Sequence, residues 1–314
     1  MVKARMRIFQ ILAFVLIWAS DSYTAEVKAI SWETKHAAPV VVLDGENEKL
    51  LPLVRFGVTA LPEQTVMRLT FVGGYALGLP KDKAKSLQEL FSRYYQRIGE
   101  DPIFSQMPSA LEYCYAKEKN SKGFATIYVP DEVKKNSRVI CFLHGSGGSF
   151  SLYLYYLAEM FPEHIIICPA YGSGCAHISS EYLAGCVQAA SDELGHKLER
   201  PILVGLSAGG FGGFREYVRR PQRYLGYICI AAYPPRDVFA KLPVGGRIRV
   251  ICGGDERFVR NGVLEKSERR VRGRVKDYES HIIPNQDHFF LLSAQEETRR
   301  LLKGWERDLR EKEE

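Results

Sequence analysis

Short, continuous apolar runs separated by longer amphipathic stretches fill the second half of this chain and limit its possible folds. The runs are residues 138–143, 164–168, 201–206, 224–231 and 247–252, with a less regular one at 275–283. Strands that are apolar without alternation are buried on both faces, as in parallel sheets. The stretches at 150–161, 179–198, 208–219, 260–272 and 289–309 have the length and spacing of helices. The pattern predicts an α/β fold, with a mostly parallel sheet and helices on both faces.

The segment just before the first run predicts antiparallel structure. Residues 111–117 and 124–129 alternate apolar and polar side chains on either side of a polar turn at 118–123. Alternation around a turn is typical of a β-hairpin. We therefore expect an antiparallel N-terminal hairpin that leads into the parallel sheet.

Residues 26–110 are expected to form an N-terminal extension packed on a domain of residues 111–314. A helix is predicted over residues 82–98, where apolar side chains recur at steps of three and four. Its apolar face needs a partner, and the following domain supplies one. The apolar runs at 38–43 and 50–58 are interpreted as strands or extended segments.

Residues 1–25 have the three-part layout of a secretory signal peptide. Lys3, Arg5 and Arg7 precede an apolar run at residues 8–19, and a polar stretch at 20–25 follows. The apolar run is short beside the roughly 20 residues that a membrane-spanning helix needs. We expect cleavage around residues 20–25, a secreted or periplasmic protein, and no stable membrane span after cleavage. An anchor formed by the uncleaved N-terminal segment is the alternative.

The charge balance gives no indication of nucleic-acid binding. The formal net charge is +6, and residues 1–25 contribute two of these charges. The basic residues at 266–276 are mixed with Glu268, which is typical of a solvated helix face. We therefore expect no nucleic-acid partner.

The cysteines do not indicate a metal centre. Of the seven, four lie in or at the end of apolar runs: Cys141, Cys168, Cys229 and Cys252. These four are expected to be buried thiols. Cys175 and Cys186 are candidates for a disulfide in an oxidising compartment. Neither Cys-x-x-Cys nor His-Glu-x-x-His occurs, so we expect neither a metal nor a cofactor.

A serine follows one of the apolar runs in a glycine-flanked turn. Gly205-Leu206-Ser207-Ala208-Gly209 fits the G-x-S-x-G pattern, in which a strand turns sharply into a helix. Gly205 and Gly209 lack side chains, which lets the strand and the helix approach closely. In open α/β sheets, functional groups gather in the loops that follow the strands, so the other loops are searched for partners.

Three further loops carry groups that such a serine needs. They are residues 144–148 (His-Gly-Ser-Gly-Gly), residues 253–255 (Gly-Gly-Asp) and residues 287–288 (Asp-His). The serine turn at 205–209 lies between the first and the second of these loops. In this chain order the four motifs resemble those of the α/β-hydrolase family over residues 111–308. The resemblance implies an α/β-hydrolase fold.

The resemblance also implies a role for each residue. Ser207 would be the nucleophile, His288 its general base and later acid, and Asp255 the carboxylate that orients the imidazole. The backbone N–H groups of Ser146 and Ala208 would stabilise the oxyanion of the tetrahedral intermediate.

Alternatives remain open for some of these assignments. Asp237 and Asp287 are the other candidates for the acid, and His281 is the other candidate for the base. His144 is expected to be a structural loop residue. Tyr171 and His177 are candidate pocket residues, although ordinary loop positions explain them equally well.

The His-Gly-Ser-Gly-Gly loop differs from the H-G-G-G loop of lipases. It is closer to that of secreted hydrolases similar to polyhydroxybutyrate depolymerases and feruloyl esterases, and to the catalytic domain of prolyl-oligopeptidase-type peptidases. We expect an exported serine hydrolase that cleaves carboxylic esters through an acyl-enzyme, on a small molecule or a polysaccharide. A carbohydrate esterase is included in this expectation. A prolyl-oligopeptidase-like peptidase and a non-catalytic binding protein are the alternatives.

Overall fold

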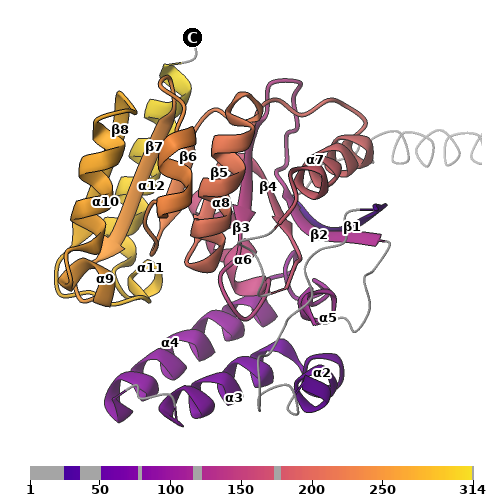
Figure 1. The fold of residues 1–314 in the computed structure, drawn as a ribbon. Coiled ribbons are helices and arrows are strands. Elements are labelled where there is room, and N and C mark those ends of the chain that lie inside the picture. Colours follow the sequence, from indigo (N-terminus) through magenta and orange to yellow (C-terminus); the bar gives the residue numbers. More distant parts are fainter. Residues whose placement is uncertain (1–24, 36–50, 77–79, 116–121, 173–177, 313–314) are drawn as a thin grey trace, which may run out of the picture.

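The computed structural model describes residues 25–35, 51–76, 80–115, 122–172 and 178–312. Within these residues, eight strands form one sheet in the order β1-β2-β4-β3-β5-β6-β7-β8 (Figure 1). The strands are β1 (Glu26–Glu33), β2 (Lys122–Val129), β3 (Arg138–Leu143), β4 (His164–Pro169), β5 (Ile202–Leu206), β6 (Tyr227–Ile230), β7 (Arg247–Gly253) and β8 (Asp277–Ile283). β2 is antiparallel to both of its neighbours, and the remaining pairs are parallel. The expected α/β-hydrolase architecture is confirmed.

Helices cover both faces of the sheet, because alternate side chains of each strand enter different cores. The larger helices are α6 (Ser151–Met160), α7 (Ser180–Leu194), α8 (Ala208–Arg219), α10 (Val263–Arg272) and α12 (Gln295–Glu311). Ile140 and Phe142 of β3 share a core with α6 and α12. Cys141 and Leu143 point the other way, into the core with α7, α8 and α10. Four of the helices expected in this half of the chain are present with shifts at their ends, and the one expected at 289–309 is divided into α11 (Phe290–Ser293) and α12.

The expected hairpin is wrong in its first strand. Residues Leu111–Cys114 form a short helix, α5, in which Leu111 and Cys114 are both buried at a helical step of three. β2 pairs instead with β1, from Glu26 opposite Val129 to Glu33 opposite Lys122. Nearly every residue of β2 is buried, so this strand needs a neighbour on each edge, which β1 and β4 provide.

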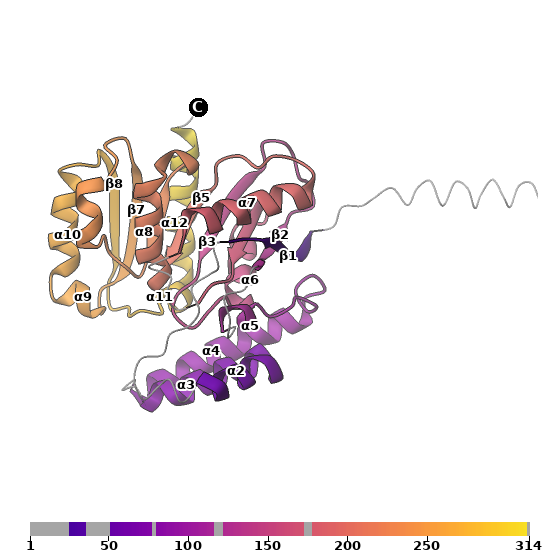
Figure 2. The same ribbon diagram turned by 45° about the vertical axis from the view of Figure 1, so that its right-hand side comes forward.

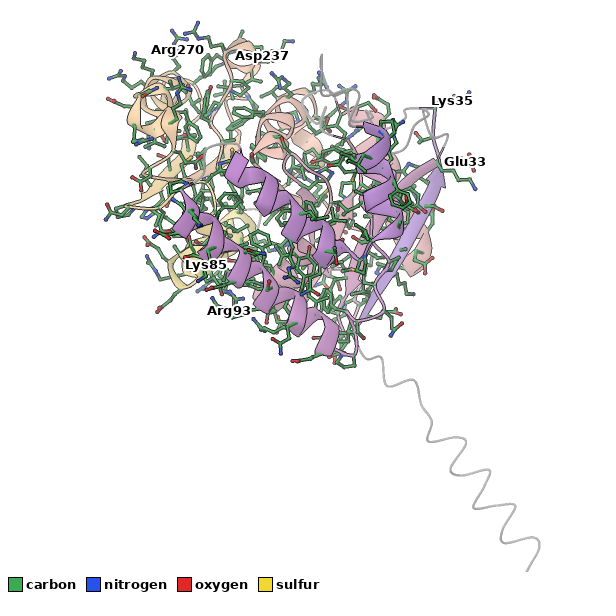
Figure 3. All side chains as sticks on the ribbon, turned by 90° about the horizontal axis from the view of Figure 1, so that it is seen from below. Glu33, Lys35, Lys85, Arg93, Asp237 and Arg270 are labelled. Atoms are coloured by element: carbon green, nitrogen blue, oxygen red, sulfur yellow. The ribbon has the colours of Figure 1, made fainter. Side chains whose placement is uncertain are left out.

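A layer of helices lies at the end of the sheet where the parallel strands finish (Figures 1 and 2). It consists of α2 (Leu51–Ala60), α3 (Glu63–Ala76) and α4 (Lys81–Glu100), called the cap below. The helix expected at 82–98 is confirmed as α4, with its apolar face buried. Seen from below, the cap crosses the molecule, and Lys85 and Arg93 lie on the outer side of α4 (Figure 3).

The extended structure expected at residues 50–58 is wrong, because residues 51–58 are part of α2. Its apolar residues Val54 and Val58 lie four positions apart and line the same cavity, as expected of one face of a helix. The other run, at residues 38–43, lies outside the described residues. The division at residue 110 stays a prediction, although β1 shows that residues 26–33 belong to the sheet.

Only some of the residues that bear on the expected export and thiols are described by the structure. Residues 1–24 lie outside the described residues, so the signal peptide stays a prediction. In the described part of the chain, no helix has the length and apolarity to cross a membrane, and no cluster of side chains suited to a metal occurs. The cysteines of these residues, Cys186 included, are buried free thiols. Cys175, its expected partner, lies outside the description.

Candidate active site

Ser207 stands on a sharp turn between β5 and α8. Its backbone has φ 53° and ψ −116°, a strained combination for a residue with a side chain. A Cβ atom on Gly205 would lie 2.5 Å from the carbonyl oxygen of Gly209, and one on Gly209 would lie 2.3 Å from that of Leu143. Both glycines are therefore required by close backbone contacts, as the sequence predicts, and the turn presents the serine hydroxyl at the end of the sheet.

His288 reaches this hydroxyl from the loop after β8. Its Nε2 atom lies 2.8 Å from Ser207 Oγ, which is a normal hydrogen-bond distance. The competing residue His281 lies inside β8, where its Nε2 atom contacts Glu297 at 3.0 Å. The structure thus brings the predicted serine and histidine together and places His281 elsewhere.

The acidic partner of His288 is Glu256, and the prediction of Asp255 is corrected here. His288 Nδ1 lies 2.8 Å from Glu256 Oε2, and the carboxylate is buried, with 6% of the residue exposed. Its second oxygen accepts a hydrogen bond from the N–H of Gly253 at 3.2 Å. Asp255 is exposed and contributes only its backbone N–H, to the carbonyl of Gln286.

The backbone after β7 explains this shift by one residue. Gly253 and Gly254 pass so close to the loop after β8 that a Cβ on Gly253 would lie 2.4 Å from the carbonyl oxygen of Gln286. Glu256 follows in an extended conformation, with φ −64° and ψ 136°. Asp255 lies in the turn with its side chain exposed, whereas the side chain of Glu256 is buried against His288. In the α/β-hydrolase pattern the acid is either Asp or Glu. The sequence therefore offered Glu256 as a candidate beside Asp255.

The two alternative acids have other partners. Asp237 pairs with Arg215 on the surface, with one oxygen 2.8 Å from Arg215 Nε. Asp287 pairs with Lys83 of the cap helix α4 and accepts the N–H of Phe289 at 2.8 Å. Neither of these carboxylates is hydrogen-bonded to His288.

His144 organises the loop opposite the serine, as expected of a structural histidine. It is 1% exposed, and its Nδ1 atom lies 2.7 Å from the carbonyl oxygen of Gly145. Its Nε2 atom accepts the N–H of Tyr171 at 3.3 Å, and the two rings stack. Burial lowers the pKa of His144 to about 4, so the imidazole is neutral at physiological pH. Tyr171 is itself fully buried and does not line the cavity, and His177 lies outside the described residues.

The expected oxyanion donors border the serine. Gly145 is so close that a Cβ on it would lie 3.3 Å from Ser207 Cβ. Ser146, which follows, lines the same cavity as Ser207. Ala208 is the first residue of α8, so its N–H has no acceptor within the helix. Both N–H groups stay predicted donors.

A cavity of about 610 Å³ opens at Ser207 and His288 and extends under the cap. Its walls come from α2, α3, α4, the loop at 145–147 and α11 (Phe290–Ser293). The lining residues are mostly apolar: Leu53, Val54, Gly57, Val58, Leu61, Val66, Met67, Leu69, Phe91, Tyr115, Gly145, Ser146, Gly147, Phe150, Tyr153, Leu206, Ser207, His288, Phe289, Leu291 and Leu292. Residues of the cap were not assigned to the site from the sequence, because their spacing has no motif.

A buried carboxylate attaches the cap to the rest of the molecule. Glu63, at the start of α3, accepts hydrogen bonds from Tyr95 (2.7 Å) and Ser109 (3.1 Å) hydroxyls and from the Ser151 N–H (2.7 Å). Burial raises the pKa of Glu63, although these hydrogen bonds oppose the shift. Ser151 is the first residue of α6, so the contact also places a carboxylate at a helix N-terminus.

Comparison with known proteins finds similar folds only among solved structures. No family model and no curated protein matches the chain. The fluorophosphonate-binding serine hydrolase F of Staphylococcus aureus has 13% identity and a TM-score of 0.47, covering 59% of this chain and 92% of its own. The poly(aspartic acid) hydrolase-1 of Sphingomonas sp. KT-1 has 15% identity and a TM-score of 0.44, covering 53% and 88%. A ferulic acid esterase has 15% identity and a TM-score of 0.46, covering 59% and 93%. At these values the likeness says nothing about the substrate.

Proposed function

We propose that the protein is a serine hydrolase that cleaves carboxylic esters through an acyl-enzyme. The observation that carries the proposal is the continuous hydrogen-bonded series of Ser207, His288 and Glu256, with both contacts at 2.8 Å. A hydroxyl is a weak nucleophile until an adjacent base removes its proton, and a base in contact with a buried carboxylate is suited to that task.

The proposed reaction follows from this arrangement. Ser207 Oγ attacks the ester carbonyl while His288 Nε2 takes the hydroxyl proton. Glu256 keeps the proton on Nδ1 and stabilises the imidazolium that forms. The N–H groups of Ser146 and Ala208 hold the oxyanion, and His288 returns the proton to the leaving alcohol. Water, activated by the same histidine, then attacks the acyl-enzyme.

The basic and apolar residues of the N-terminal 19 positions support export, so we place the mature protein outside the cytoplasm. Polysaccharide-linked esters remain among the candidate substrates, with small-molecule esters. A peptidase would use the same three groups, so only the choice of substrate distinguishes it from an esterase. A non-catalytic binding protein has no use for the strained conformation of Ser207, with its φ of 53°.

Labelling with a fluorophosphonate probe tests the nucleophile. The wild-type protein is expected to react, and Ser207→Ala is expected not to react. Hydrolysis of p-nitrophenyl acetate in preference to a proline p-nitroanilide supports the esterase. Equal labelling of both proteins refutes the serine assignment, and the reverse substrate preference favours the peptidase.

A further inference from the structure

The cap forms one wall of a pocket that starts at the reacting atoms. Val54, Gly57 and Val58 lie along one side of α2, at steps of three and one, and line the cavity together with Leu61, which directly follows the helix. The cavity also reaches Ser207 and His288. An ester whose carbonyl lies at Ser207 therefore has a partly open, mostly apolar space beside its reacting carbon.

The chemistry of this wall excludes polar acyl groups. Among the lining residues that the structure describes, no Asp, Glu, Lys or Arg occurs. The hydroxyl of Tyr115 already donates to the carbonyl of Gly147 at 3.0 Å. The hydroxyls of Tyr153 and Ser146 also line the cavity, but they are too few to replace the hydrogen bonds to water that a charged or hydroxyl-rich acyl group would lose, which costs free energy.

The size of the cavity fits a chain of medium length. If a methylene occupies about the volume of a water molecule in the liquid, roughly 30 Å³, a ten-carbon chain occupies roughly 300 Å³. That is about half of the 610 Å³ available. Pockets are commonly larger than the ligands that they enclose, in the range of about 300–1,000 Å³. At the edge, Leu53 and Leu69 are 68% and 56% exposed and continue the apolar surface outward.

We propose that this cavity binds the acyl chain of the substrate and selects aliphatic chains of about eight to twelve carbons. The proposal rests on the ester hydrolysis proposed above and specifies its substrate class. Each methylene that leaves water for the cavity contributes about 0.8 kcal/mol, or about a fourfold gain in kcat/KM. The gain is expected to continue through twelve carbons, because a chain of that length occupies roughly 360 Å³ and does not fill the cavity.

Gly57 offers a way to fill the cavity without disturbing the fold. A Cβ atom on Gly57 would have no neighbour within 4 Å, although the residue lines the cavity. Gly304, inside α12, has the same open surroundings and lies outside the lining. Gly57→Phe and Gly304→Phe are therefore a matched pair, in which the same change is made in a helix with and without contact to the cavity.

The first experiment measures kcat/KM for p-nitrophenyl esters of two to twelve carbons. The wild-type values are expected to rise by up to about fourfold per methylene toward ten carbons. Because the chain is proposed to lie against α2, a phenyl ring at position 57 displaces up to about three methylenes from this wall, so Gly57→Phe is expected to lower the ratio of decanoate to butanoate turnover by up to about 60-fold. Gly304→Phe is expected to keep the wild-type ratio. A flat or falling wild-type profile, or equal ratios in both variants, overturns the acyl-chain proposal.

The second experiment does not depend on turnover. Decanoate and butanoate are titrated calorimetrically into Ser207→Ala, with and without the Gly57→Phe substitution. Tighter binding of decanoate that Gly57→Phe removes supports the cavity assignment, and equal binding of the two acids refutes it. If no ester is cleaved while this binding holds, ester hydrolysis fails and the cavity assignment stands. If acetate esters are cleaved while the chain length has no effect, ester hydrolysis stands and the cavity assignment fails.

Discussion

Replacing Glu256 by Gln removes a charge next to the proposed base and, with Oε1 still facing the Gly253 N–H, turns an amide NH2 toward His288 Nδ1. The amide keeps the size of the carboxylate and can still accept the Gly253 N–H, which now lies 3.2 Å from Oε1. What changes is the interaction with His288, whose Nδ1 atom is 2.8 Å from Oε2. For charges about 4 Å apart at an effective dielectric constant of about 20, the lost attraction on the imidazolium is about 4 kcal/mol. That corresponds to about a thousandfold loss in kcat.

The neighbouring acid supplies the control for this prediction. Asp255 is exposed, so Asp255→Asn is expected to change kcat by less than about threefold and the free energy of unfolding by less than about 0.5 kcal/mol. Steady-state hydrolysis of p-nitrophenyl butanoate gives kcat for both variants, and circular dichroism melts verify that each is folded. A loss below tenfold in Glu256→Gln, or a larger loss in Asp255→Asn, would show that Glu256 does not support the base.

Three further changes test the elements around the site. Gly209→Ala places a Cβ 2.3 Å from the Leu143 carbonyl oxygen and is expected to abolish folded, active protein. Gly304→Ala, in an open part of a helix, is expected to raise the free energy of unfolding by about 1 kcal/mol. Circular dichroism and urea unfolding compare the two variants. Glu63→Ala leaves its buried donors without an acceptor and is expected to lower that free energy by about 3 kcal/mol, measured by urea unfolding. Because the pKa of His144 is lowered to about 4, the unfolded chain binds this proton at higher pH than the folded one. The free energy of unfolding should therefore fall by about 3 kcal/mol as the pH drops from about 6.5 to about 4, and urea melts of His144→Asn should show a shallower slope.

The parallel half of the sheet is predictable from the sequence because burial on both faces leaves a local pattern. Each of β3, β4, β5 and β7 is a short apolar run whose composition alone reports its environment. The pairing of β1 with β2 is different. Its two strands lie about a hundred residues apart, and an exposed edge strand such as β1 alternates only weakly, so nothing local identifies the partner.

The site was predictable to the extent that each residue follows a strand. Ser207 and His288 lie at fixed places after β5 and β8, and the glycines at 205 and 209 are dictated by backbone contacts. Glu256 was missed because the direction of a side chain in a turn depends on backbone angles that the sequence does not show. No individual residue of the cap could be assigned to the cavity from the sequence. The cap contributes a shape, made by apolar residues on three helices, and no single residue spacing encodes a shape.

The cap does more than enclose a volume, because it is tied to the loops that carry the proposed chemistry. Lys83 of α4 pairs with Asp287, whose other oxygen accepts the Phe289 N–H at 2.8 Å, and His288 stands between these two residues. On the other side, Arg55 of α2 donates to the carbonyl of Tyr115 at 2.8 Å, and the Tyr115 hydroxyl donates to that of Gly147. One helix thus positions the segment with the base, and another positions the loop with the predicted oxyanion donor. A displacement of the cap would break these contacts to both loops, so we expect the proposed chain binding to be coupled to the alignment of Ser207 with His288.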